Sequence, residues 1–81
     1  MALNLKIISP EKIEFDGTVE SVHVPGTKGK FVILKDHAPI ISSLQPGVVE
    51  YVVDGDRKSL IITGGFVEVQ KNMVNLCVEL K

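Results

Sequence analysis

The chain has 81 residues, enough for one domain with a thin hydrophobic core, and we expect that domain to span residues 1–81. Nine basic residues are balanced by ten acidic ones, which argues against a nucleic-acid-binding protein because such proteins usually carry an excess of basic charge. The single cysteine, Cys77, excludes an internal disulfide and is typical of a reducing compartment.

From the N-terminus onward, short apolar segments alternate with turn residues. Leu3, Leu5 and Ile7 are separated by polar residues, the period of two that is typical of a β-strand, and Pro10 ends this run. Ile13 begins a second short segment. The further expected strands are Val19–Val24, Lys30–Leu34, Ile40–Leu44, Val48–Val53, Lys58–Thr63, Phe66–Gln70 and Met73–Leu80. The expected turns or breaks are Asp16–Gly17, Pro25–Gly29, Asp36–Pro39, Gln45–Gly47, Asp54–Asp56, Gly64–Gly65 and Lys71–Asn72.

No segment has the apolar spacing of an amphipathic helix, whereas turn residues recur at intervals typical of an all-β protein. We therefore predict a single small β-sandwich or flattened barrel with about eight to ten short, mostly antiparallel strands. Alternation within one of these strands places Val22 and Val24 on one face of the sheet, and Ser21 and His23 on the other.

Few residues are of the types that bind metals or act as nucleophiles. The two histidines, His23 and His37, and Cys77 do not have the close spacing of a zinc site. Cys77 lies in a strand-like apolar run, which favours a half-buried structural thiol. Gly26 and Gly29 lack the Gly-Lys-Ser/Thr ending of a phosphate-binding loop. The sequence therefore predicts no catalytic residue, no cofactor and no metal site.

Two residues leave alternatives open. His37 either fixes the turn before Pro39 by hydrogen bonding or contacts a partner protein. The segment Glu68–Val74 faintly resembles the hairpin of lipoyl and biotinyl carrier domains, which present a modified lysine at a tight turn. Lys71 would be that lysine, although it lies too near the end of the sequence for the second half of a carrier domain to follow.

The segment Gly29–Gly47 has an unusual order: an apolar strand, a forced break at His37-Ala38-Pro39, a second apolar strand and a Gln-Pro-Gly turn. It resembles the middle of the epsilon subunit of F-type ATP synthase, which is called delta in mitochondria. Leu5–Pro10, Phe15–Gly26 and Thr63–Val69 resemble the opening strand, the second strand with its loop, and a later Gly-Gly segment of that subunit. The resemblance covers nearly the whole chain.

This resemblance implies a non-catalytic central-stalk subunit whose N-terminal β-sandwich couples the gamma shaft to the membrane c-ring during proton-driven ATP synthesis. The implied partners are the gamma subunit, the polar loops of the c-ring and, through gamma, the catalytic head. The chain would reach the membrane only through this complex. We expect a peripheral location on the cytoplasmic face of a bacterial inner membrane, since the sequence has neither a signal peptide nor a membrane-spanning run.

The resemblance also assigns two sets of contact residues. The c-ring-facing set is Gly26, Thr27, Lys28, Gly29, Lys30 and Phe31. The gamma-facing set is Ser9, His37, Ile40 and Ser42. Ile40 and Ile41 are adjacent, so they point to opposite faces of a strand, and we expect Ile40 to be the one that faces outward.

The sequence departs from the family pattern in several places. Lys30 occupies a position that is often Glu in the family, and Lys28 adds a second positive charge nearby. Either the ring loop carries compensating acidic residues or this charge contact is not essential. Most family members also continue as a C-terminal helical hairpin, which this sequence lacks. We expect a short form without the inhibitory hairpin, the other possibility being a shortened piece of a longer chain.

Overall fold

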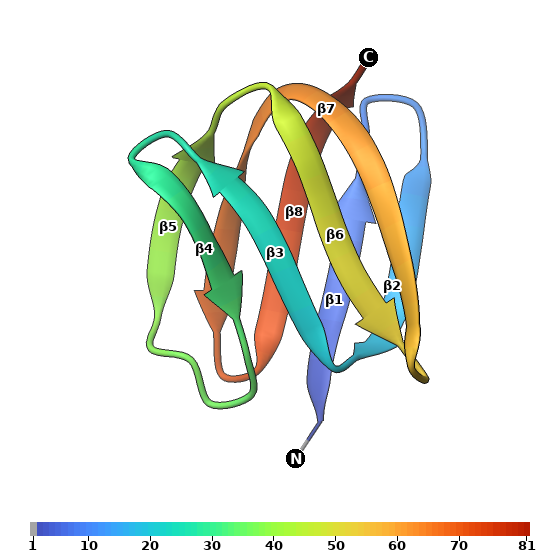
Figure 1. Cartoon of the computed structure of the whole chain (residues 1–81), viewed down its shortest axis with the longest axis vertical. Coiled ribbons are helices and arrows are strands. Elements are labelled where there is room, and N and C mark those ends of the chain that lie inside the picture. Colours follow the sequence, from blue (N-terminus) through green and yellow to red (C-terminus); the bar gives the residue numbers. More distant parts are fainter. Residues whose placement is uncertain (1) are drawn as a thin grey trace.

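The computed structural model describes residues 2–81, which form eight β-strands and no helix (Figure 1). In chain order the strands are β1 (Leu3–Ile8), β2 (Ile13–Val19), β3 (Ser21–Gly26), β4 (Gly29–Ile33), β5 (Ile40–Leu44), β6 (Gly47–Val53), β7 (Asp56–Gln70) and β8 (Met73–Leu80). The predicted all-β class is confirmed. Every strand pairing is antiparallel apart from that of β1 with β8, which is parallel.

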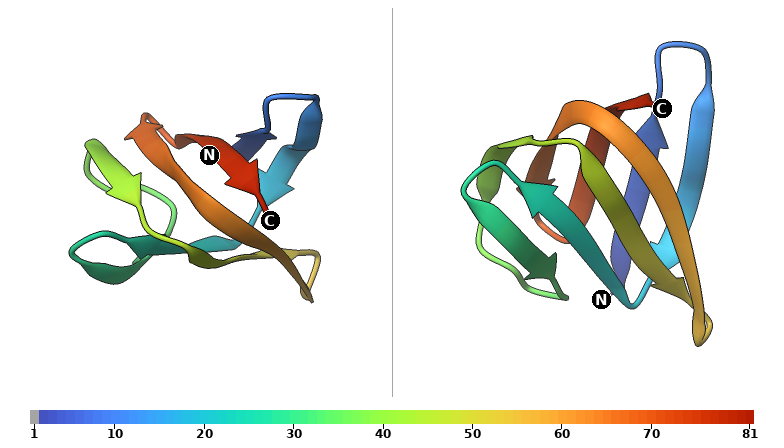
Figure 2. Two further views of the ribbon diagram at one scale, coloured as in Figure 1. Left: turned by 90° about the horizontal axis from the view of Figure 1, so that it is seen from above. Right: turned by 45° about the horizontal axis from the view of Figure 1, so that its top comes forward.

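Two sheets pack face to face, and strand β7 belongs to both of them (Figures 1 and 2). One layer contains β2, β1, β8, the C-terminal part of β7 and β5, in that order. The other layer contains β4, β3, β6 and the N-terminal part of β7. The turn between β3 and β4 and the connection between β1 and β2 lie at one end of the molecule, and the β4–β5 loop lies at the other (Figure 1).

Strand alternation directs one face of each sheet into the core. Leu3, Leu5 and Ile7 of β1 are at most 2% exposed, and Val22 and Val24 of β3 are buried as predicted. Further fully buried side chains from both layers are Ile33, Val49, Ile62, Val67, Val69, Val74 and Leu76. Burying one such side chain contributes about 1.5–3 kcal/mol, so the contact between the two layers is the main source of stability.

The prediction of a hairpin turn at Gly64–Gly65 is wrong, because the chain bends there without reversing. β7 continues unbroken over 15 residues. Its first part, as far as Ile62, pairs with β6. It pairs with β8 from Ile62 onward and with β5 from Gly65 onward. The register against β8 shifts between Ile62 and Gly64, and Gly65 has a φ of 145°, which side chains other than glycine rarely allow. The bend lets one strand leave the first layer and enter the second.

The turn predicted at Asp16–Gly17 is also wrong. These two residues lie inside β2, where Gly17 pairs with Leu5 of β1. The Phe15 ring lies over Gly17, where an added Cβ would be 3.3 Å from the ring. The glycine therefore provides room for an aromatic ring rather than a change of direction. The predicted strand Val19–Val24 is divided accordingly, because its first residue ends β2 and Glu20 separates β2 from β3.

The tight turns predicted at the ends of β6 and β7 are confirmed. Asp54 and Gly55 have φ values of 50° and 82°, and Lys71 and Asn72 have values of 51° and 60°. Positive φ at both central residues is the geometry of the two-residue hairpin that matches the twist of its strands. Lys71 is exposed at the tip of its hairpin.

Asn72 ties three segments of the chain together. Its Nδ2 donates to Asp36 Oδ1 at 3.1 Å, and its Oδ1 accepts from the backbone N–H of Asp36 at 2.6 Å. Its carbonyl oxygen accepts from the backbone N–H of Asn4 at 2.9 Å. The side chain of one turn residue thereby anchors the β4–β5 loop, which contains His37.

We expect Asn72→Ala to lower the free energy of unfolding by about 2 kcal/mol, because two hydrogen bonds are lost and alanine is strained at positive φ. Urea denaturation followed by circular dichroism measures this change. Asn75→Ala is the matched control, since Asn75 lies on the outer face of β8 and its removal should change stability by less than about 0.5 kcal/mol. Equal stability of the two variants would contradict the anchoring role.

Candidate interaction surfaces

An apolar band crosses the outer face of the layer that contains β2, β1, β8, β7 and β5. The pairing of the strands places several apolar residues side by side on this face. Ile8 is opposite both Ile13 and Cys77, and Cys77 is opposite Phe66. Ile41 on β5 is the diagonal neighbour of Phe66. Phe66, Ile13 and Ile41 are 49%, 53% and 74% exposed. We call Ile8, Ile13, Ile41, Phe66 and Cys77 the apolar band; large exposed groups of this kind mark contact surfaces.

A shallow hollow of about 370 Å³ lies beside the band and is partly lined by its residues. Its lining includes Ile8, Pro10, Phe66 and Cys77, so its walls are mostly apolar. Glu79 lies at its edge, and Glu68 follows on the same face of β7. This surface suits a partner that presents an apolar side chain flanked by basic groups.

The four predicted gamma-facing residues do not lie together. Ser9 belongs to the β1–β2 connection at one end of the molecule, and His37 belongs to the β4–β5 loop at the other (Figure 1). Ile40 and Ser42 lie on β5 between these ends. The apolar band covers part of the same layer, reaching from the neighbourhood of Ser9 across to β5.

Ser9 is 7% exposed, and its hydroxyl is already used inside the domain. The Oγ donates to Glu14 Oε2 at 2.9 Å and accepts from the backbone N–H of Lys12 at 3.3 Å. These bonds order the connection between β1 and β2. The Ser9 side chain therefore shapes the edge of the hollow rather than projecting from it.

The expectation that Ile40 faces outward is wrong. Ile40 is half-buried against the core opposite Val69, whereas Ile41 is the exposed neighbour. The phase of the strand decides this, because Leu44 is buried and residues an even number of positions away share its face. Ser42 shares that inward face and is half-buried, with its hydroxyl donating to the carbonyl of Ser43 at 3.0 Å.

The surroundings of His37 support the turn-fixing interpretation. Its Nδ1 lies 2.7 Å from the carbonyl oxygen of Ala38, so this ring nitrogen carries the proton. Its backbone N–H donates to the carbonyl of Leu34 at 3.2 Å. The ring is half-buried, with its centre 6.4 Å from that of Phe31. Part of the His37 residue remains exposed to solvent.

The c-ring-facing set forms a tighter structure than the predicted Pro25–Gly29 loop. Pro25 and Gly26 are buried in β3, and Gly29 already pairs with Gly26 at the start of β4. Only Thr27 and Lys28 form the turn. A Cβ on Gly26 would lie 2.8 Å from the carbonyl oxygen of Gly29, so the hairpin closes tightly only with glycine there.

This hairpin is hydrogen-bonded to β5. The backbone N–H of Thr27 donates to the carbonyl of Ser43 at 3.1 Å, and the two hydroxyls are 2.9 Å apart. The backbone N–H of Gln45 donates to the carbonyl of Pro25 at 2.9 Å. A groove of about 510 Å³ lies between the hairpin and β5. It brings Lys28 and Lys30 to the same depression as Ile40 and Ser42, so the two predicted sets meet there.

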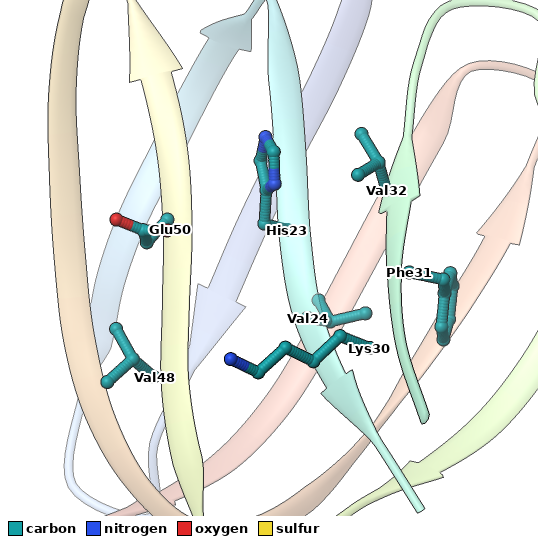
Figure 3. Close-up of a pocket in the computed structure, with 7 residues that line it drawn as sticks. All are labelled: His23, Val24, Lys30, Phe31, Val32, Val48 and Glu50. Carbon is teal, nitrogen blue, oxygen red and sulfur yellow. The ribbon is translucent and has the colours of Figure 1, made fainter. Parts of the chain in front are cut away.

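On its other side the hairpin borders a second depression of about 370 Å³, on the outer face of β3, β4 and β6. Figure 3 shows the Lys30 side chain extending across β3 in the direction of Val48. His23 stands opposite Glu50 of β6 and Val32 of β4. Lys30 therefore borders both depressions.

Among residues 2–81, no group of three or more His, Cys, Asp or Glu side chains gathers where it could hold a metal ion. Burial raises the pKa of Tyr51, and the negative charge of Glu14 raises it further. The Tyr51 ring packs on Phe15, with ring centres 4.8 Å apart, so it serves the core. Cys77 is free and half-buried, as predicted. The described part of the chain has no helical segment with the length and apolar character needed to span a bilayer.

Two packed sheets with an exposed apolar band and a fastened hairpin tip are typical of a domain that docks on other proteins. Residues 2–80 match the family described as "ATP synthase, Delta/Epsilon chain, beta-sandwich domain". The chain belongs to this family. The family match extends through the exposed turn that contains Lys71. It therefore favours the resemblance to the epsilon subunit over the lipoyl or biotinyl carrier domain.

Curated relatives agree with this assignment. The chain is 41% identical over 78 residues to the ATP synthase epsilon chain of Rippkaea orientalis, covering 96% of this chain and 57% of the relative. It is 43% identical over 77 residues to the ATP synthase epsilon chain of Leptospira borgpetersenii, covering 95% of this chain and 61% of the relative. The chain thus spans roughly three fifths of the length of these relatives.

Solved structures show the same fold. A chain in the Euglena gracilis mitochondrial ATP synthase superposes with a TM-score of 0.89 at 20% identity, covering 95% of this chain and 50% of that one. A chain in the central stalk/c-ring structure of the Tetrahymena thermophila mitochondrial ATP synthase gives 0.81 at 21% identity, covering 98% and 64%. At these identities the similarity defines the fold alone.

Proposed function

We propose that this chain acts as the β-sandwich part of a non-catalytic central-stalk subunit that couples the gamma shaft of an ATP synthase to its membrane c-ring. The observation that carries the proposal is the apolar band, which a member of this family would cover by docking on gamma. The chain would then lie at the cytoplasmic face of a bacterial inner membrane through the complex, and reach the catalytic head through gamma.

The gamma-facing surface comprises the apolar band, with Ile41 replacing Ile40. Ser42 faces the other side of β5 and lies outside this surface, whereas His37 adds the exposed part of its imidazole near the start of that strand. Ser9 supports the hollow at the other end of the band through its bond to Glu14. An apolar centre with polar groups around it is the usual composition of a stable protein interface.

The c-ring-facing surface is the hairpin tip, in which Thr27, Lys28, Gly29 and Lys30 are exposed. Gly26 and Phe31 shape the hairpin from within, because one is buried and the other half-buried. Coupling a turning ring to a shaft requires a stiff element. Two sheets joined by a shared strand resist shear, because relative sliding would break both their hydrogen bonds and their packed core.

Binding to the gamma subunit of the same synthase tests this proposal. Size-exclusion chromatography with light scattering should detect a one-to-one complex. Phe66→Asn and Ile41→Asn should each weaken it by about 30-fold, because removing an apolar anchor from the centre of an interface costs about 2 kcal/mol or more. Isothermal titration calorimetry gives the dissociation constants.

Ile61→Asn is the matched control, since Ile61 is 58% exposed but lies on the outer face of the other layer. Its complex should keep the affinity of the unmodified chain. Failure of the folded chain to bind gamma at micromolar concentration would refute the proposal. An intact-mass measurement then examines the carrier alternative, because a lipoyl or biotinyl group would add a fixed mass at Lys71.

A further inference from the structure

We propose that the tip formed by Thr27, Lys28, Gly29 and Lys30 selects a partner loop that carries carboxylates. This inference rests on the proposed function, because it takes the tip to be the part of the domain that faces the ring. The inference adds one requirement to that function: the ring loop must be acidic where it contacts the tip, rather than basic or uncharged.

The first observation is that two positive charges at the tip have no acidic partner within the described residues. Lys28 and Lys30 are exposed, and neither has an ion-pair partner among residues 2–81. The carboxylate that borders the same depression as Lys30 is Glu50, and Arg57 holds it at 3.5 Å. The tip therefore presents two cations that the domain itself does not neutralise.

The second observation is the absence of acidic residues from the groove beside the tip. The groove beside the tip is lined by Lys28 and Lys30 and by no acidic residue. The net charge of −1 therefore conceals a tip whose charged residues are both positive.

The third observation is that the tip backbone is fixed before any partner arrives. Thr27 is bonded to Ser43 through both its backbone and its hydroxyl. Gly26 leaves no space for a side chain, and Gly29 holds a φ of 128°. Two lysines on a fixed turn present their charge at a defined place, which favours selection by charge over adaptation of the loop.

A competing explanation exists for one of the lysines only. Lys30 lies in β4, which is the last strand of the sheet path, and edge strands often carry lysine to prevent pairing with other chains. Lys28 lies in the turn, outside any strand, so edge protection does not account for it. The two positions together therefore point to a partner with the opposite charge.

The experiment measures binding of the complex between gamma and this chain to the detergent-solubilised c-ring of the same synthase, by biolayer interferometry at low and at high ionic strength. The test variant is Lys28→Glu with Lys30→Glu. The matched control is Lys58→Glu with Lys71→Glu, which changes the net charge equally at exposed positions away from the tip. We expect the test variant to bind about tenfold more weakly at low ionic strength, and the control within about twofold.

Two further results complete the prediction. High ionic strength should weaken binding of the unmodified chain and reduce the difference between the two variants, because exposed charges are screened. Changing the acidic residues of the ring's polar loop to lysine should restore binding of the test variant. Tighter binding of the test variant to the unmodified ring would mean a basic loop and would overturn the inference.

The outcomes separate this inference from the function on which it rests. If the unmodified complex binds the ring and both variants bind equally well, the charge selection is refuted and the coupling function stands. If the unmodified complex does not bind the ring at any ionic strength, the proposed function fails, and the inference fails with it.

Discussion

Gly65→Ala is expected to destabilise the fold severely. Gly65 has a φ of 145°, and a Cβ added there would overlap the carbonyl oxygen of Cys77 and lie 2.9 Å from the Cα of Val78. These contacts are backbone atoms of β8, which cannot rotate away as a side chain can. We expect a loss of about 4 kcal/mol or more, against a total stability of about 4–12 kcal/mol for a domain of this size.

The neighbouring glycine provides the control for this experiment. Gly64→Ala introduces the same methyl group one residue earlier, where the nearest atom, the carbonyl oxygen of Leu44, is 3.9 Å away. Its φ is not positive, so stability should change by less than about 1 kcal/mol. Guanidinium denaturation of both variants gives the comparison. A Gly65→Ala protein as stable as the Gly64→Ala protein would show that the bend in β7 does not need glycine.

Ile40→Asn is expected to lower the free energy of unfolding by about 3 kcal/mol. The side chain is half-buried against the core, so the change removes apolar contact and brings an amide next to Val69 without a hydrogen-bond partner. The same change at Ile41, which is 74% exposed, should cost less than about 1 kcal/mol. The pair differs in one respect only, the face of β5 on which the residue lies.

Thermal and urea denaturation of the two variants measure this difference in stability. In the gamma-binding assay we expect the reverse order, with Ile41→Asn the more damaging change. Ile41→Asn should be stable but bind gamma poorly. Ile40→Asn should be destabilised but, below its unfolding transition, bind gamma with nearly unchanged affinity. Equal destabilisation by both changes would contradict the inward position of Ile40.

Local patterns predicted the strands well, because alternation and turn chemistry act over a few residues. Asp54 and Gly55 are a favoured pair for a two-residue hairpin, and they form one. Gly64 and Gly65 carry an equally strong turn signal, yet β7 continues through them. A glycine pair is compatible with a reversal or with a bend, and the choice depends on strands β5 and β8, which lie far away in the sequence.

The interaction surface was less accessible to sequence reasoning. The outward phase of Ile41 could have been found, because Leu44 marks the inward face and shares it with Ile40. The apolar band could not, since Ile13, Phe66 and Cys77 become neighbours only through the register of separate strands. Pairing between strands is set by the whole fold, whereas the sequence displays one strand at a time.

The parallel pairing of β1 with β8 also affects how the chain folds during its synthesis. Asn4 pairs with Met73 and Ile8 with Cys77, so the second edge of β1 acquires its partner only when β8 has been synthesised. Until then a nascent chain exposes an unpaired apolar strand, and contacts this distant in sequence form slowly. The period between the appearance of β1 and that of β8 at the ribosome is therefore when a chaperone would protect this chain most.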